Sequence, residues 1–189
     1  MLIDTHAHLY WDSYKEDFDQ VIQNCVDANV LTIINVGVDV ELSKNAFQQV
    51  QGKLTRISGL TMYSTIGIHP HEAIKYDSDV SIHQDIERLE EIHQNSAGKV
   101  IAVGECGLDY KEVDEQVKDL QKQLFQAQIN LAKKLNLPLI VHCRDDRSKN
   151  PQNSEAWDEV LKMVGDCPTI LHCYSGLPPT TNSILQTTN

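Results

Sequence analysis

A chain of 189 residues is long enough to bury one sizeable hydrophobic core, so the sequence predicts a single domain. Hydrophobic residues make up 41% and charged residues 23% of the chain, which is ordinary for a soluble globular protein. The formal net charge of −11 argues against a broad basic surface for nucleic acid, but a phosphodiester substrate is compatible with it if bound divalent cations supply the positive charge.

Six short apolar runs rich in valine and isoleucine recur along the chain, each apolar on both faces, as strands covered on both sides are. Amphipathic segments lie between them, the clearest over residues 117–135, where apolar residues recur every three or four positions. Shorter helical patterns cover 21–26, 86–92 and 157–164. In chain order, the expected strands are residues 1–4, 31–37, 64–68, 100–104, 137–141 and 169–171.

Strand and helix alternating six times predict an α/β fold with a parallel sheet, either open and doubly wound or closed into a barrel. No GxGxxG follows the first strand, and a titratable residue follows each strand instead, which favours a TIM-like (β/α) barrel. A complete eight-unit barrel needs about 250 residues. We therefore expect about six of the eight βα units, forming one domain over residues 1–176, and a polar tail over 177–189.

Four of the expected strands end in side chains that bind metals. His6 and His8 lie two apart at the end of the first strand, so both point to one face, although an HxH pattern also arises by chance. Glu105 follows four apolar residues and is costly to bury unless it is paired or bound to metal; the alternative is a helix cap or a loop acid. His142 and His172 end the fifth and sixth strands, where a single histidine is more often a hydrogen-bonded core residue.

Together these five side chains lie at one level of the expected barrel. Imidazole and carboxylate donors suit Zn, Mn or Fe, and carboxylates with water also admit Mg. Glu105 is placed to bridge two metal ions.

Three further residues could act on a substrate. His69 and His71 follow the third strand, where they could contact a phosphate, support the site, or serve only as cap or solvated residues. Arg144 could clamp a phosphate with two N–H groups, or form an ion pair with Asp145 or Asp109. Asp109 is placed to orient a histidine ligand.

Five motifs in order resemble those of the TatD-related deoxyribonucleases, and the match runs from residue 1 to about residue 176. The resemblance implies a (β/α) barrel of the metal-dependent hydrolase superfamily, two divalent metal ions (Mg, Mn or Zn) and hydrolysis of DNA. By this analogy, His6, His8 and Glu105 hold one metal, and Glu105, His142 and His172 hold the other. Glu105, Arg144, His69 and His71 are then the catalytic residues. The motifs are Asp4-Thr5-His6-Ala7-His8, Gly67-Ile68-His69-Pro70-His71, Gly104-Glu105-Cys106-Gly107-Leu108-Asp109-Tyr110, Val141-His142-Cys143-Arg144 and His172-Cys173-Tyr174-Ser175-Gly176.

The family has a further aspartate at the end of its eighth strand, in a Thr-Asp-x-Pro-type segment that these 189 residues do not contain. The chain therefore resembles a family member without its last two strands. Two alternatives to a deoxyribonuclease stay open. One is an esterase of the aminoacyl-tRNA deacylase type, and the other is a noncatalytic fragment that self-associates through exposed sheet edges.

The sequence opens without a basic segment or a long apolar run, and no stretch approaches the roughly 18 apolar residues of a membrane span. We therefore expect a cytoplasmic protein without a membrane partner. An odd number of cysteines with no CxxC pair predicts reduced thiols rather than disulfides or a zinc ribbon. The cysteines are Cys25, Cys106, Cys143, Cys167 and Cys173.

Overall fold

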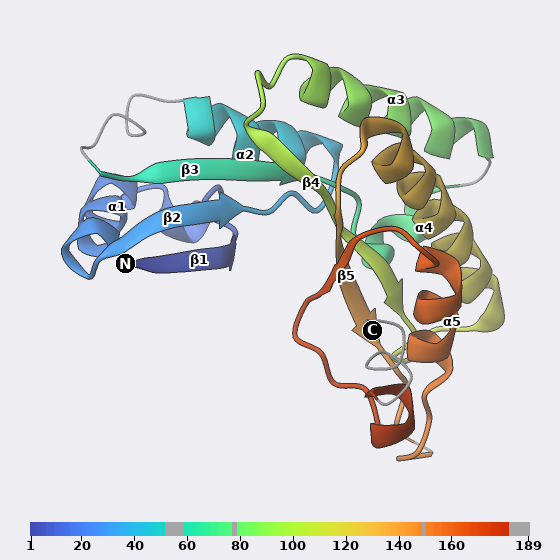
Figure 1. Cartoon of the computed structure of the whole chain (residues 1–189). Helices are drawn as coiled ribbons and strands as arrows, with labels where there is room; N and C mark the ends of the chain where they lie inside the picture. The colour runs from blue at the N-terminus through green and yellow to red at the C-terminus, as the bar shows by residue number, and fades with distance from the viewer. Residues whose placement is uncertain (52–58, 77–78, 149, 182–189) are drawn as a thin grey trace.

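The computed structural model describes residues 1–51, 59–76, 79–148 and 150–181, and its centre is one parallel sheet of six strands in chain order (Figure 1). A doubly wound sheet reverses its strand order at a switch point, so the unbroken order excludes that alternative. The sheet curls strongly, and β4 and β5 run steeply across the direction of β2 and β3 (Figure 1). The α/β prediction of a TIM-like barrel with six units is confirmed. The strands are β1 (Leu2–Ala7), β2 (Val30–Asn35), β3 (Thr61–Ile66), β4 (Val100–Asp109), β5 (Leu139–Arg144) and β6 (Thr169–Leu171).

The helices lie along the outer side of the curled sheet (Figure 1). The longest, α4, begins after Asp114, whose carboxylate accepts a hydrogen bond from the Val117 backbone, and it ends at Asn136 in the left-handed conformation. The expected segments at 21–26, 86–92, 117–135 and 157–164 all fall within helices. The sequence analysis did not single out α2, although its buried face carries Val40, Phe47 and Val50 beside Ser43 and Ala46. The helices are α1 (Phe18–Asp27), α2 (Val40–Gln51), α3 (Asp79–Gln94), α4 (Glu115–Leu135) and α5 (Glu155–Val164), with the 3-10 helices η1 (Asp12–Tyr14) and η3 (Pro70–Lys75).

Strand β4 runs five residues past its expected end, and this places Glu105 inside the strand. A glycine permits the extension. Gly107 has a φ of +136°, and a Cβ at this position would lie 2.0 Å from the backbone oxygen of His142. Only glycine therefore allows β4 to approach β5 so closely, and the approach brings Glu105 beside His142.

The core forms two clusters of buried side chains. The larger packs α3, α4 and α5 against β3, β4 and β5, with Trp157 and Phe125 fully buried. The smaller packs α1 against β2 and β3 around Ile22, Ile33 and Met62. These clusters hold the sheet against its helices and leave the inner rim of the curl to polar side chains.

The expectation that every strand is covered on both sides is wrong for β1. Leu2 and Ile3 are 59% and 54% exposed, and Ile170 on β6 is 54% exposed. The reason is topological, because β1 and β6 are the two edges of the sheet and each has a single neighbouring strand within the described ranges. Two rows of backbone N–H and C=O groups thus lack a ladder partner.

The start of the expected polar tail is packed. Residues 178–181 form a helical turn, Thr180 is buried, and the Tyr174 hydroxyl lies 2.9 Å from the Thr181 hydroxyl. The rest of the tail, 182–189, lies outside the described residues, and the domain boundary at 176 stays a prediction. The five cysteines are free thiols, as predicted. In the described part of the chain, no helix is both long and apolar enough to cross a membrane.

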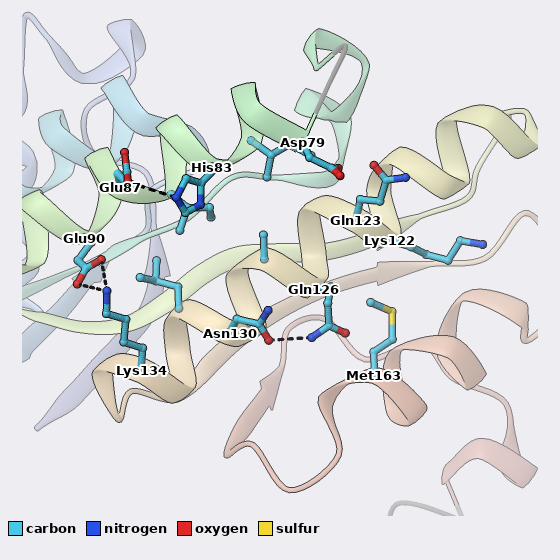
Figure 2. Close-up of a pocket in the computed structure, with 14 residues that line it drawn as sticks. Asp79, His83, Glu87, Glu90, Lys122, Gln123, Gln126, Asn130, Lys134 and Met163 are labelled. Carbon is cyan, nitrogen blue, oxygen red and sulfur yellow. Dashed lines mark hydrogen bonds and ion pairs between the residues drawn. The ribbon is translucent and has the colours of Figure 1, made fainter.

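A groove of about 770 Å³ runs along the outer face between α3 and α4 (Figure 2). Ion pairs lie along it, with Lys134 Nζ 2.7 Å from Glu90 and His83 Nε2 3.3 Å from Glu87. None of the residues that the sequence singled out for chemistry lines this groove. The candidate site is therefore a separate feature, at the carboxyl ends of the strands.

Candidate metal centre

Glu105 is the centre of a cluster of imidazoles. Its side chain is buried, with 5% of the residue exposed, and lies at the inner rim of the sheet. One carboxylate oxygen, Oε2, lies 3.3 Å from His6 Nε2 and 3.9 Å from His8 Nε2. The other, Oε1, lies 3.2 Å from His142 Nδ1 and 4.0 Å from His69 Nε2. Residues from β1, β4, β5 and the segment after β3 thus converge on one carboxylate.

The donor atoms form two groups that share Glu105. In one, the donor atoms of His6, Glu105 and His172 all lie within 4.8 Å of one another, and in the other those of His69, Glu105 and His142 do. The rings of His6 and His172 stack with centroids 3.6 Å apart. The family analogy grouped His172 with His142 instead. The structure and the analogy therefore place His172 on different sides of Glu105.

The orientation of His8 is set by its neighbours. Its Nδ1 lies 2.9 Å from the Val36 carbonyl oxygen and 2.9 Å from the Tyr10 hydroxyl. Since a carbonyl oxygen only accepts hydrogen bonds, Nδ1 carries the proton. The lone pair is then on Nε2, which faces Glu105, and this is how proteins commonly prepare a histidine for a metal.

The protonation states of the cluster suit a divalent cation. Burial lowers the pKa of His69 to about 4, with the neighbouring His142 adding to the effect. Burial also lowers the pKa of His8 and of His172. Burial alone would raise the pKa of Glu105, but its contacts with His142 and His6 outweigh this and hold the pKa well below its usual range. The neutral imidazoles of His8, His69 and His172 and the ionised carboxylate of Glu105 are donors that suit Zn or Mn, and the carboxylate also admits Mg.

Asp109 forms a second acidic centre behind the first. It is fully buried, and its Oδ2 lies 3.0 Å from His142 Nε2 and 2.9 Å from His71 Nε2. Burial would lower the pKa of His142, but its contacts with Asp109 and Glu105 raise it to about 9. His142 is therefore held between two carboxylates, and Asp109 lies where an acid that orients this histidine should lie.

Arg144 donates to the same carboxylate. Its Nε lies 3.0 Å from Asp109 Oδ1 and one terminal nitrogen lies 2.8 Å from Oδ2. The sequence left open whether Arg144 pairs with Asp145 or with Asp109. In the structure Arg144 pairs with Asp109, and Asp145 pairs with Arg147. The side chains of Arg144 and His71 remain 45% and 56% exposed. Both therefore face solvent at the rim of the site, where a phosphate contact stays a prediction.

Two buried glutamines of α4 support the site, and the sequence reasoning missed them. The Gln121 amide exchanges two hydrogen bonds of 2.8 Å with the backbone of Asp109. The Gln128 amide accepts from the Ile68 N–H at 2.7 Å and donates to its carbonyl at 2.9 Å. The signal was present, because both residues are polar yet occupy the apolar face of an amphipathic helix.

Replacing Gln128 with leucine is expected to lower the free energy of unfolding by about 2–5 kcal/mol, because the buried N–H and C=O of Ile68 would each lose a partner. The measurement is urea denaturation of the metal-free chain. Gln126, which is exposed on the same helix, supplies the matched control, and Gln126→Leu should change stability by about 0.5 kcal/mol or less. Equal effects of the two substitutions would contradict the assigned role of Gln128.

Comparison with known proteins places these features in a family context. The family model described as "TatD related DNase" matches residues 3–188. The chain is 35% identical over 176 residues to "Uncharacterized metal-dependent hydrolase YabD" of Bacillus subtilis, covering 93% of this chain and 62% of that protein. It is 30% identical over 175 residues to "3'-5' ssDNA/RNA exonuclease TatD" of a Pantoea species, covering 93% and 60%.

Solved structures give the same result. A hydrolase of the TatD family from Entamoeba histolytica superposes with a TM-score of 0.81 at 25% identity, covering 99% of this chain and 62% of that one. The TatD homologue YJJV from Escherichia coli superposes with a TM-score of 0.73 at 27% identity, covering 99% and 65%. The chain thus spans about three fifths of the length of the relatives that it matches.

Proposed function

Because this chain belongs to the TatD-related DNase family, we propose that it is a metal-dependent hydrolase that cleaves phosphodiester bonds of DNA. The observation that carries the proposal is the shared position of Glu105, a buried and ionised carboxylate within reach of two groups of imidazoles. Curated relatives named as exonucleases of single-stranded DNA and RNA support single strands as the substrate.

We infer a centre for two divalent ions, Mg, Mn or Zn, that share Glu105. His6 and His172 would hold one ion together with Glu105, with His8 beside them, and His142 would hold the other, with His69 facing it. When bound, the ions supply a nucleophilic water at neutral pH and stabilise the charge that develops on the phosphate.

The protein's own groups would orient the histidine ligands and position the substrate. The Val36 carbonyl fixes the tautomer of His8, and Asp109 fixes the ring of His142. His71 and Arg144 present partly exposed N–H groups beside the cluster, where they would hold phosphate oxygens of the substrate. The net negative charge of the chain repels a polyanion, so the metal centre and this rim would supply the local attraction.

Removal of the metal tests the proposal. The purified chain, loaded with Mn, is expected to degrade end-labelled single-stranded DNA, and chelation should lower the rate by at least about a hundredfold, because the ions supply the nucleophile and the charge stabilisation. Restoring Mn should restore the rate, and metal content is measured in parallel. A folded chain that binds Mn yet cleaves no DNA would overturn the proposal, and hydrolysis of an aminoacyl ester by that chain would favour the esterase alternative.

We also propose that the chain of 189 residues associates with itself through the edges of β1 and β6, where backbone groups lack a ladder partner. Ile3→Lys should weaken this association, because a charge on an exposed edge opposes strand pairing. Sedimentation over a range of concentrations measures it. Val80→Lys, at a residue of α3 that is 66% exposed, is the control. A monomer at all concentrations would contradict the proposal.

A further inference from the structure

An aromatic cleft of about 580 Å³ lies beside the metal centre, between the segment after β1 and the start of α1. It belongs to the size range of sites that bind small ligands. Its aromatic lining comes from Tyr10, Trp11, Tyr14 and Phe18. The proposed hydrolysis assigns no role to these four side chains.

The cleft adjoins the cluster through His8, whose ring contacts those of both Trp11 and Tyr10. The Trp11 ring stacks on that of His8, with centroids 4.7 Å apart and planes 11° from parallel. His8 in turn directs its Nε2 toward Glu105. Trp11 is 49% exposed; the His8 ring stacks on it, and its side chain forms a hydrogen bond with Tyr10. One indole face is thus covered by the imidazole, and much of the remaining surface is open to a ligand.

The segment that carries Trp11 is held in place by buried polar groups. The Leu9 N–H donates to the Asn35 side chain at 2.9 Å, and the Leu9 carbonyl accepts from Gln49 at 3.1 Å. Asn35 itself donates to Gln49 at 2.8 Å and is fully buried. The backbone N–H of Trp11 then donates to the His8 carbonyl. A platform fixed before binding costs little ordering entropy when a ligand arrives.

The charges around the cleft select a flat and neutral group. Lys15 lines the cleft, but Asp12 and Asp19 line it as well. The cleft therefore has no excess of positive charge with which to hold a phosphate. A nucleobase is flat, neutral and able to stack on an indole ring, and base stacking on aromatic side chains is how proteins bind single strands without reading their sequence.

We propose that this cleft binds a nucleobase of the nucleic-acid strand, stacked on Trp11, while the neighbouring phosphate lies at the metal centre. The assignment rests on the proposed function and deepens it, since it names the part of the substrate that the chain recognises. The base and the phosphate can be bound side by side because His8 lies next to Glu105 and its ring also stacks on that of Trp11.

The test compares two probes of equal charge in the presence of chelator, so that no hydrolysis is needed. One is a short oligothymidylate, and the other is a sugar–phosphate oligomer of the same length without bases. The chain has two tryptophans, and Trp157 is fully buried against Tyr174, so quenching of fluorescence by a stacked base reports on Trp11. Oligothymidylate should quench the fluorescence, and the oligomer without bases should not.

Variants at Trp11 supply the matched pair, read by anisotropy of a labelled oligothymidylate. Trp11→Leu should weaken binding by about 5- to 150-fold, which corresponds to the loss of one stacked base. Trp11→Phe keeps a ring and should weaken binding by about threefold or less. Binding of the oligomer without bases should be the same for all three chains.

The failures of the two proposals are distinguishable. Equal binding of both oligomers, or equal binding by Trp11→Leu and Trp11→Phe, would overturn the cleft assignment even if DNA is hydrolysed. Binding that depends on the base and on the ring, in a chain that hydrolyses no DNA when loaded with Mn, would support the cleft and overturn the proposed hydrolysis.

Discussion

Replacing Glu105 with glutamine is expected to abolish the binding of both divalent ions and to lower hydrolysis of single-stranded DNA by at least about a hundredfold. The substitution preserves the shape of the side chain and removes its charge. Because Glu105 belongs to both donor groups, one change should empty both positions at once. Substitution of a histidine on one side of the cluster, such as His172→Ala, should instead reduce the bound metal by one ion.

Metal content by mass spectrometry and the rate on end-labelled DNA together measure this effect. Glu87→Gln provides the matched control, since that side chain lies on α3, is 61% exposed and contacts only the surface residue His83 among the described ion pairs. It should leave both readouts unchanged. Near-ultraviolet circular dichroism checks that each variant keeps its packing. Glu105→Gln with two bound ions and an ordinary rate would show that Glu105 does not bridge a metal pair.

Replacing Asp109 with asparagine is expected to weaken metal binding by about 10- to 100-fold and to lower the free energy of unfolding by about 2–4 kcal/mol. The carboxylate is fully buried and contacts His142, His71 and Arg144. Asparagine offers one oxygen and no charge, so the guanidinium of Arg144 loses its counterion. His142 would also lose the partner that holds its ring toward Glu105.

Isothermal titration with Mn and urea denaturation measure the two parts of this prediction separately. Asp166→Asn is a fitting control, because its side chain is 95% exposed and pairs with Lys133 at the surface. That variant should bind Mn as the unmodified chain does and unfold at the same urea concentration. If Asp109→Asn bound Mn with unchanged affinity, Asp109 would be a structural acid with no influence on the metal centre.

Much of the fold could be predicted from local patterns. Alternation of apolar runs with helical periods identified the parallel sheet and four of the five α-helices found among the described residues, because each pattern depends on residues close together in the chain. The same reasoning missed α2, although its buried face is largely apolar. It also placed the end of β4 too early, since the glycines that end an apolar run here allow β4 to continue along β5.

The residues of the candidate site could be predicted from the sequence, but their contacts could not. His6, His8, Glu105, His142 and His172 could be named from the sequence, because each follows or ends an apolar run and such runs end at one rim of a parallel barrel. Their metal roles remain predictions. The pairing of His172 with His6, and the joint contact of His71, His142 and Arg144 with Asp109, came only from the structure.

By itself, then, the sequence determined the fold class and the side chains able to carry the chemistry, since strand ends and apolar periods are properties of consecutive residues. Only the tertiary structure decided which of these side chains meet, that Gln121 and Gln128 hold the backbone beside them, and that Trp11 stacks on His8. It also showed that β1 is an exposed edge. The physical reason is that contacts between distant residues depend on the curl and register of the sheet, which no local pattern encodes.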